Sequence, residues 1–328
     1  MSSVFIIVFG LIGFTFGWFV YSKFIAEKIY RLDPDYVTPA HTFNDGIDFV
    51  PTNKFVLWGA HFTSVAGAAP IVGPAIAVYW GWGPALLWVT FGSIFFAGVH
   101  DMGALWASTR HKAKSIGALS EDVVGKRTRA LFMVVIFLLL LMVNAVFGTI
   151  IASEMVDIPT SVFPAGAAIP VAVGIGVLIR KQYNLLLISI IGVVILYFSI
   201  YIGSVMPLEL PADIFGLGPN GNWIILLFVY AGIASSLPVW LLLQPRDYLN
   251  AHQLITGLSL LTLGLVVLRP EVVAPAFNLS PEGAPPVIPF LFITIACGAI
   301  SGFHGLVSSG TTSKQVGCMT DAKAIGYG

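Results

Sequence analysis

The sequence carries little charge. Only 10% of its 328 residues are Asp, Glu, Lys or Arg, whereas 57% are hydrophobic. Soluble domains carry about 25% charged residues, so this composition excludes an ordinary soluble domain and indicates a membrane protein. The 16 basic and 16 acidic residues cancel. The net charge therefore gives no reason to expect nucleic acid or another polyanion as a partner.

Cysteines and catalytic motifs are also scarce. Cys297 and Cys318 are too few for a disulfide framework. The GxxxxGK[ST] loop of ATP-driven pumps is missing, and so are HExxH, GxSxG and paired-carboxylate motifs. These absences disfavour an ATPase and a membrane-embedded enzyme. We expect no metal or organic cofactor.

Long apolar runs fill the chain instead. Nine of them reach the length of about 17–25 residues that a membrane-spanning helix needs. They lie near residues 4–22, 54–80, 84–109, 130–152, 160–179, 184–205, 222–243, 250–268 and 287–311. The expected fold class is an all-α polytopic membrane protein with about nine transmembrane helices in a lipid bilayer.

The basic residues predict how the chain threads through the membrane. If the N-terminus lies outside, every Lys and Arg except Arg269 falls on the inner side. Loops on the cytoplasmic side carry this kind of excess of basic residues. We therefore expect a multi-pass protein with its N-terminus outside.

Three of the predicted spans contain helix breakers. The second has Gly67 and Pro70, the seventh has Gly232 and Pro238, and the ninth has a run rich in Gly, Ser and Thr at 301–312. Freed backbone groups are tolerated in lipid only where protein or a water-filled cavity satisfies them. Packing of small residues could explain any single break. Three breaks together favour a transport site at the bilayer midplane.

The spacing of these breaks predicts an internal repeat. The second and seventh spans lie five spans apart, and an odd number of crossings reverses the direction of the chain, as in secondary transporters with inverted repeats. Residues 1–52 then form a first helix and an inner loop, 53–205 a five-helix repeat, and 206–328 three helices of a second repeat. Two more spans, in this chain or a second chain, would complete that repeat.

Three long motifs point to a family. They read NKFVLWGAHFTSVAGAAPIVGPAIA at 53–77, GVHDMGALWASTRHKAKSIG at 98–117 and CGAISGFHGLVSSGTTSK at 297–314. A chain with these motifs resembles the carbon starvation proteins, CstA, whose members are longer, so it resembles a member truncated at its C-terminus. The resemblance implies a carrier in a bacterial or archaeal inner membrane, with the five-plus-five, LeuT-like inverted repeat. It also implies uptake of peptides during carbon starvation, or of pyruvate with protons.

Asp101 is an acid inside the third predicted span. An ionisable group at this depth costs about 2.5–3.5 kcal/mol on insertion scales and is a functional hypothesis by default. With His100 it is our candidate for proton coupling, and the alternative is an ion pair or hydrogen bond near Arg110. His61 and His304 lie beside breaks and could exchange protons near neutral pH. The more common explanation for each of them is a satisfied interior histidine.

Small polar groups and freed backbone near the breaks are candidates for binding substrate or sodium. The set comprises His61, Ser64, Ala66, Gly67, Asn144, Ser235, Ser236, His304, Ser308, Ser309, Thr311 and Thr312. The hydroxyls of the ninth span could bind sodium together with carbonyls from Ala66 to Ala69, or could bond back to their own helix. Ser235 and Ser236 are the repeat-related counterpart. Asn144 either bridges helices or contacts substrate.

The leading interpretation is a proton-coupled secondary carrier. Its substrate would be a small carboxylated molecule, a peptide or pyruvate, because the N-terminus of a half-helix favours an anion. Protons are the expected coupling ion and sodium is the alternative. A channel is the second hypothesis and would need a pore ringed by charge or carbonyls. A starvation-linked sensor or a remnant without transport is the third.

Overall fold

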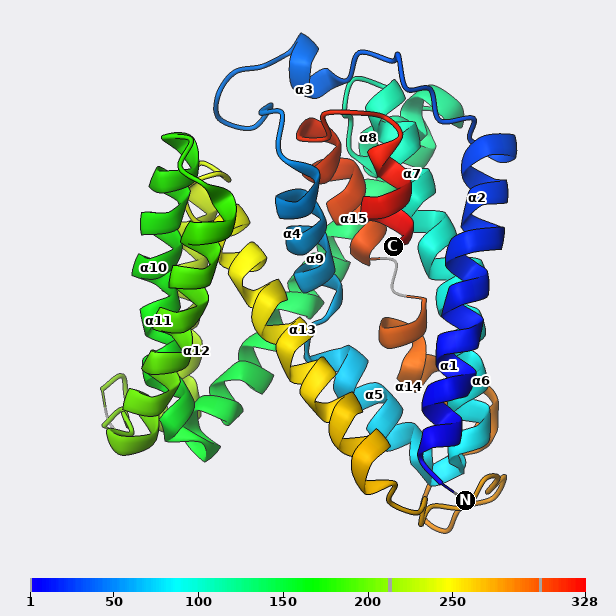
Figure 1. Ribbon diagram of the computed structural model, residues 1–328, viewed down its shortest axis with the longest axis vertical. Coiled ribbons are helices and arrows are strands. Elements are labelled where there is room, and N and C mark those ends of the chain that lie inside the picture. The colour runs from blue at the N-terminus through cyan, green and yellow to red at the C-terminus, as the bar shows by residue number, and fades with distance from the viewer. Residues whose placement is uncertain (1, 212–213, 301–302) are drawn as a thin grey trace. The chain divides into compact units, whose positions relative to one another are not determined.

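The computed structural model describes residues 2–211, 214–300 and 303–328, and helices make up the regular structure of these segments. Contacts divide the chain into two compact units. Unit 1 comprises Met1–Leu119 and Leu254–Gly328, and unit 2 comprises Ser120–Gln253. Each unit is described by itself below, with the helix labels of Figure 1.

Unit 1 contains most of the motif residues. Its helices are α1 (Val4–Phe16), α2 (Ser22–Phe24), α3 (Pro39–Thr42), α4 (Lys54–Val65), α5 (Ala68–Ala77), α6 (Trp82–Gly92), α7 (Gly98–Arg110), the start of α8 (Ile116–Val123), α14 (Val287–Ala299) and α15 (Phe303–Gly310). The π-helical turns Gly17–Tyr21 and Ile25–Ile29 extend α1, and a third, Ser93–Ala97, joins α6 to α7. Two long apolar helices result, Val4–Ile29 and Trp82–Arg110.

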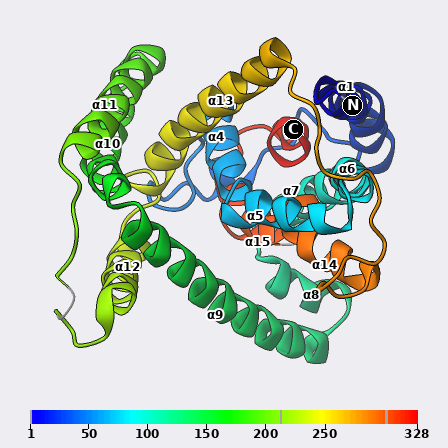
Figure 2. The same cartoon turned by 90° about the horizontal axis from the view of Figure 1, so that it is seen from below.

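The core of unit 1 forms where α14 and α15 pack against the first half of the chain. In both views α14 lies beside α5 and α6, and α15 contacts α7 and α4 (Figures 1 and 2). Leu291 and Ile295 of α14 are fully buried against Trp80. A methyl group at Gly73 would lie 2.6 Å from the carbonyl oxygen of Thr294. Small residues thus permit the close helix contact on which packing in a bilayer depends.

Loops that we predicted to share one side of the membrane meet at the same end of unit 1. At one end, the Ser3 amide donates to the Pro270 carbonyl at 3.1 Å. At the opposite end, the Thr52 amide donates to the Gln315 carbonyl at 3.0 Å (Figure 1). The alternation of the chain within this unit therefore agrees with the loop assignment, whereas the placement of the N-terminus outside stays a prediction.

Unit 2 consists of long helices. They are α9 (Lys126–Asp157), α10 (Val162–Arg180), α11 (Leu185–Val205), α12 (Gly218–Ser236) and the first part of α13 (Leu243–Leu268). The side chain of Asn184 caps α11 by accepting hydrogen bonds from the Leu186 and Leu187 amides. A methyl group at Gly176 would lie 2.7 Å from the Leu241 carbonyl. Glycine therefore lets α10 approach the segment between α12 and α13.

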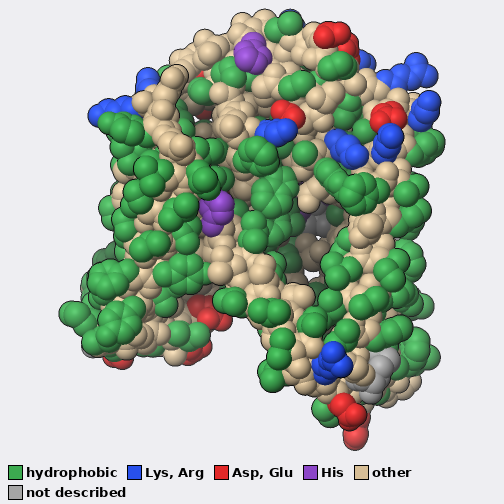
Figure 3. Space-filling model, in the orientation of Figure 1, with side chains coloured by type: hydrophobic (Ala, Val, Ile, Leu, Met, Phe, Trp, Pro, Cys, Tyr) green, Lys and Arg blue, Asp and Glu red, His purple; other side chains and the backbone are tan. Residues whose placement is uncertain are grey.

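Much of the surface is apolar. In α9, 32 residues long, only Gly148 and Ala152 are buried. Charged residues stand at its two ends, namely Lys126, Arg127 and Arg129 at the start, and Glu154 and Asp157 at the end. Hydrophobic side chains also cover the flank of α1, with Lys and Arg gathered beyond it near α2 (Figure 3). Exposed apolar helices with charged ends are typical of a protein that faces lipid.

The helices support a polytopic membrane protein. Within the described segments, seven helices are long and apolar enough to cross a membrane, or eight if the bent pair Lys54–Val65 and Pro70–Trp80 forms one span. The nine-span count and the inverted repeat stay predictions. The division into 1–52, 53–205 and 206–328 also stays a prediction, because the two contact units follow other boundaries.

The bounds predicted for the seventh and eighth spans were wrong. We expected a helix over 222–243, but α12 ends at Ser236, and the next helix begins at Leu243 rather than near residue 250. Pro238 explains the difference, because it lacks a backbone donor and disfavours helical geometry in the residue before it, and Leu237 is indeed extended with ψ at 151°. The break in this region therefore lies at the junction of two helices and not inside one.

Candidate functional site

The break predicted in the second span is present. α4 ends at Val65 and α5 begins at Ala68, and the two parts of the bent pair meet at 42°. Ala66 leaves helical geometry with ψ at 47°, and Gly67 is extended with ψ at −173°. The Ser64 hydroxyl donates to the His61 carbonyl at 2.7 Å, inside the last turn of α4.

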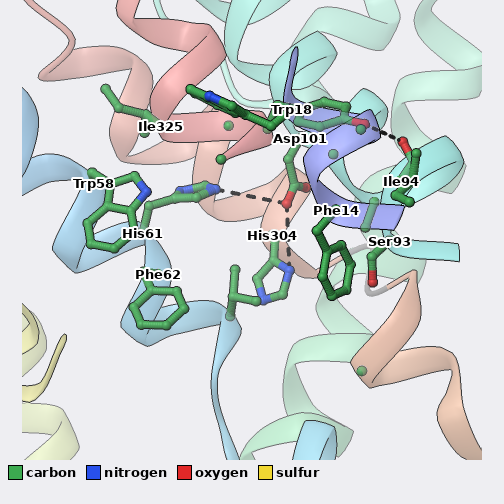
Figure 4. Close-up of a pocket in the computed structure, with 18 of the residues that line it drawn as sticks. Phe14, Trp18, Trp58, His61, Phe62, Ser93, Ile94, Asp101, His304 and Ile325 are labelled. Carbon is green, nitrogen blue, oxygen red and sulfur yellow. Dashed lines mark hydrogen bonds and ion pairs between the residues drawn. The ribbon is translucent and has the colours of Figure 1, made fainter. Parts of the chain in front are cut away.

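Four titratable residues meet beside this break. Asp101 of α7 places Oδ2 3.9 Å from His61 Nε2 and 3.7 Å from His304 Nδ1 (Figure 4). His100 Nδ1 lies 2.8 Å from Asp101 Oδ1. The side chains of His61, Asp101 and His304 are only 4–6% exposed, and that of His100 is 35% exposed. We call these four residues the acid–histidine cluster.

The tautomer of His304 follows from its second contact. His304 Nε2 lies 3.3 Å from the Ser64 carbonyl, which can only accept, so Nε2 carries the proton of a neutral ring. His304 Nδ1 then faces Asp101 Oδ2 without a hydrogen. When Asp101 is ionised and His304 is neutral, a lone pair of Oδ2 faces a lone pair of Nδ1, and the two atoms repel each other. One proton added between them turns this repulsion into an attraction. The pair has a place for one exchangeable proton.

His61 makes a similar pair of contacts. His61 Nδ1 lies 3.4 Å from the Thr312 hydroxyl, and Nε2 faces Asp101. His61 Nε2 is shielded from solvent and has no hydrogen-bond partner within the described chain. Burial of a polar group without a partner is costly and marks this position as unusual for a merely structural histidine.

A cavity of about 510 Å³ opens beside the cluster. His61, Asp101 and His304 line one part of it, and aromatic side chains line much of the rest: Phe14, Trp18, Trp58, Phe62 and Tyr327. Figure 4 shows His61 and His304 directed at Asp101 from two sides, with the aromatic rings around them. An apolar cavity of this size with a few convergent polar groups suits a small organic molecule.

The four hydroxyls predicted to bind an ion differ in their surroundings. Ser309 belongs to a separate network, in which its carbonyl accepts from the Ser108 hydroxyl at 2.8 Å and its own hydroxyl accepts from the Ile116 amide at 3.1 Å. Ser308 is fully buried, and its oxygen has no hydrogen-bond partner in the described segments. Thr312 contacts His61, and Thr311 is exposed.

We call Ser108, Ser309 and Ser313 the serine cluster. Ser108 Oγ lies within 2.8 Å of the Lys114 carbonyl, the Ser309 carbonyl and Ser313 Oγ, and Ser313 Oγ donates to the Ser309 carbonyl at 2.8 Å. This cluster fastens α7 to α15. The sequence analysis did not single out Ser108 or Ser313, although both stand within the quoted motifs.

The remaining candidates lie in unit 2 and bond to their own helices. The side-chain amide of Asn144 donates to the Leu140 carbonyl at 2.8 Å, and Asn144 is exposed. Ser235 and Ser236 are also exposed, and their hydroxyls donate to the carbonyls three residues earlier. The bond of Asn144 stays within α9 and does not bridge helices, which was the alternative for this residue. Substrate contact at these three positions stays a prediction.

Arg246 is a residue whose place the sequence analysis missed. We assigned it to an inner loop, but it lies in the first turn of α13, inside a helix long and apolar enough to span a membrane. A signal was available, because Arg246 and Asp247 form a charged pair next to a long apolar run. The predicted helix start near residue 250 hid it.

Comparisons with known proteins give one consistent result. The model of the family described as "Carbon starvation protein CstA" matches residues 2–328. The peptide transporter CstA of Campylobacter jejuni is 40% identical over 338 residues, which cover 100% of this chain and 48% of that protein. The pyruvate/proton symporter BtsT of Escherichia coli K12 is 38% identical, over 100% of this chain and 47% of that protein. No solved structure matches the chain.

A relative from a third organism agrees. The peptide transporter CstA of Bacillus subtilis is 36% identical over 100% of this chain and 56% of its own length. The chain thus spans about half the length of the curated relatives it matches.

Proposed function

Since the chain belongs to the carbon starvation protein CstA family, we propose that it serves in proton-coupled secondary transport of a small carboxylated molecule. Relatives are named as peptide transporters and as a pyruvate/proton symporter, so peptides and pyruvate are the two substrate candidates. The protein acts in the inner membrane with its N-terminus outside, in the response to carbon starvation. Sodium remains the alternative coupling ion.

One observation carries the proton coupling. Asp101 Oδ2 and His304 Nδ1 face each other at 3.7 Å with room for one proton between them, on the wall of a cavity. A proton bound there neutralises the carboxylate or charges the imidazole. Either change alters the local field that a substrate in the cavity meets, and so binding of proton and substrate become linked.

The cavity wall supports a small organic substrate. Its aromatic side chains can pack on the apolar part of a molecule, and the acid–histidine cluster offers the polar contact. A protonated His61 or His304 would attract a carboxylate, whereas the ionised Asp101 with neutral histidines would repel it. Uptake of a carboxylated molecule together with a proton follows from this charge balance.

Labelled uptake tests the proposal. Cells that lack other carriers express this chain, with and without two added C-terminal spans, and receive labelled pyruvate or a labelled dipeptide. We expect saturable, uphill uptake of one of the two that a protonophore abolishes and that persists when choline replaces sodium. Downhill flux alone would favour a channel. No uptake of either molecule by either form of the chain would refute the proposal.

A further inference from the structure

Unit 2 contains an arginine, in a helix long and apolar enough to span a membrane, that the acid–histidine cluster does not involve. Arg246, in the first turn of α13, is half-buried. Its Nη1 donates to the Tyr230 hydroxyl at 2.7 Å, and its guanidinium carbon lies 5.5 Å from the centre of the Tyr230 ring. Its Nε is shielded from solvent and meets no hydrogen-bond acceptor within the described chain. Guanidinium stays charged in a protein, so this position keeps a cation with an unused donor.

Two cavities of unit 2 meet at this side chain. One, of about 500 Å³, has Arg246 on its wall together with five polar residues: Thr160, Ser161, Ser204, Asn250 and Gln253. The other, of about 610 Å³, also has Arg246 on its wall, but its surroundings are chiefly apolar and include Phe163, Trp223, Leu226 and Leu227. Arg246 therefore lies between a cavity that has several polar groups and one that has few.

The edge of the guanidinium decides what kind of molecule fits. The bond from Nη1 to Tyr230 uses one donor of the group, and on its other edge Nε has no acceptor within the described residues. Paired N–H donors on one edge of arginine match the two oxygens of a carboxylate. A buried donor that lacks an acceptor gains most from such a partner, because folding has already removed it from water.

From this geometry we infer that Arg246 binds the carboxylate of a small molecule in unit 2. The rest of the molecule extends into the two cavities, with hydrogen-bonding groups toward Asn250 and Gln253 and apolar groups toward Trp223. The adjacent Asp247 interacts electrostatically with Arg246 and reduces its net attraction for anions. Binding therefore depends on the directed pair of hydrogen bonds and not on charge alone.

The inference rests on the proposed function for the identity of the molecule, since both candidate substrates carry a carboxylate. It can nevertheless fail separately, because it concerns binding at one named side chain and not uptake. A dipeptide with a free C-terminus and pyruvate are the two probes. The same dipeptide with a C-terminal amide keeps the shape and removes the carboxylate.

Chemical protection tests the site on the native protein. Phenylglyoxal modifies accessible guanidinium groups, and peptide mapping by mass spectrometry reports the rate at Arg246. We expect alanyl-alanine or pyruvate to slow modification of Arg246 at least about 5-fold, as for a group occupied most of the time. Alanyl-alanine amide should give no protection. Arg180, which stacks on Trp240 at 4.4 Å and lines neither cavity, serves as the internal control.

Variants test the same point by affinity. Arg246→Gln should weaken binding of the protecting probe to the purified full chain by about 10- to 100-fold, as expected for loss of a charge-assisted pair of hydrogen bonds. Arg180→Gln should leave the affinity unchanged. Arg246→Lys keeps the charge and loses the paired edge, so it should also bind several-fold more weakly.

Each outcome bears on the inference. Equal modification of Arg246 with and without the free-acid probes would overturn it, and so would failure of phenylglyoxal to reach Arg246 at all. Equal protection by the amide would also overturn it. If Arg246→Gln does not fold, the protection experiment on the native chain still decides. Protection of Arg246 in a chain that takes up neither probe would leave the inference standing and refute the proposed transport.

Discussion

Two polar clusters lie two turns apart on α7, and both face α15. At Asp101, the carboxylate and two imidazoles lie 3.7–3.9 Å apart beside a cavity, and His61 Nε2 has no hydrogen-bond partner within the described residues. At Ser108, every contact of the hydroxyl is 2.7 or 2.8 Å long. Similar burial on one helix pair thus produces a saturated network and an unsaturated one.

The difference separates structure from function. A saturated buried network stabilises the fold and has no capacity for another partner. An unsaturated one costs stability and is retained where it binds something that the protein takes up and releases. We therefore expect changes in the acid–histidine cluster to alter transport and changes in the serine cluster to alter stability.

The largest effect should come from Asp101→Asn. The amide cannot take up and release a proton, so uphill uptake should fall by at least about 100-fold, the scale on which a positioned proton-transfer group acts. Exchange of labelled for unlabelled substrate needs no net proton movement and should persist. Paired uptake and exchange assays in proteoliposomes measure both.

A control variant tests whether the effect is specific to Asp101 or follows from the loss of any acidic side chain. Glu154→Gln removes an acid at the end of α9 and should preserve uphill uptake. Unchanged uphill uptake in Asp101→Asn would abolish the contrast between the two clusters.

A smaller effect, on stability alone, should follow from Ser108→Ala. The Ser108 hydroxyl has one hydrogen to share between the Lys114 and Ser309 carbonyls, so the change removes one donor from the serine cluster, at a cost of about 1–3 kcal/mol. The midpoint of thermal unfolding in detergent should fall, while uptake per folded molecule and its pH profile stay the same. Thr149→Ala, on exposed α9, should change stability by less than about 0.5 kcal/mol. A shifted pH profile of uptake in Ser108→Ala would place the serine cluster in the transport machinery.

The smallest effect should arise at Asp45, where a saturated hydrogen-bond network is exposed to solvent. The carboxylate of exposed Asp45 accepts hydrogen bonds from the amides of Ile47, Asp48 and Phe49, at 2.8–2.9 Å. These bonds, that from Ile47 first, lower the pKa of Asp45. The contribution of Asp45 to stability is therefore fully present above the pKa of an unfolded aspartate, and it is lost as the pH falls through the lowered pKa.

Amide hydrogen exchange can measure this loop. Exchange at Ile47, Asp48 and Phe49, corrected for the intrinsic pH dependence, should show protection that disappears at acid pH in the native chain. In Asp45→Asn the amide oxygen still accepts but no longer titrates, so the protection should be weaker and independent of pH. Protection that is unchanged in acid would show that the ionised carboxylate of Asp45 is not what protects these amides.

Hydropathy predicted the helices well where turns mark their ends. α11 was expected over 184–205 and runs from Leu185 to Val205, capped by Asn184. The prediction was wrong around Pro238, because an apolar segment continues through a junction where the backbone is not helical. Composition reports that a segment is apolar, whereas the extended backbone of Leu237 before Pro238 ends the helix.

The site was predictable in part. Depth in an apolar run identified Asp101, and the breakers identified His61 and His304 as neighbours of irregular backbone. Their convergence on one carboxylate could not be predicted, because lipid-facing and buried positions of these helices are equally apolar. For the same reason Ser235 and Asn144 were candidates alongside Thr312, although both are exposed.

The length of α9 has a consequence for how unit 2 stands in the membrane. Arg129 and Glu154 lie 25 residues apart on this helix, which corresponds to about 37 Å along its axis. The hydrocarbon layer of a typical bilayer is about 30 Å thick. The helix therefore relieves the mismatch by tilting, by kinking or by locally thickening the bilayer around it. Lipids with longer acyl chains reduce this mismatch, so the thickness of the bilayer affects how unit 2 is accommodated in it.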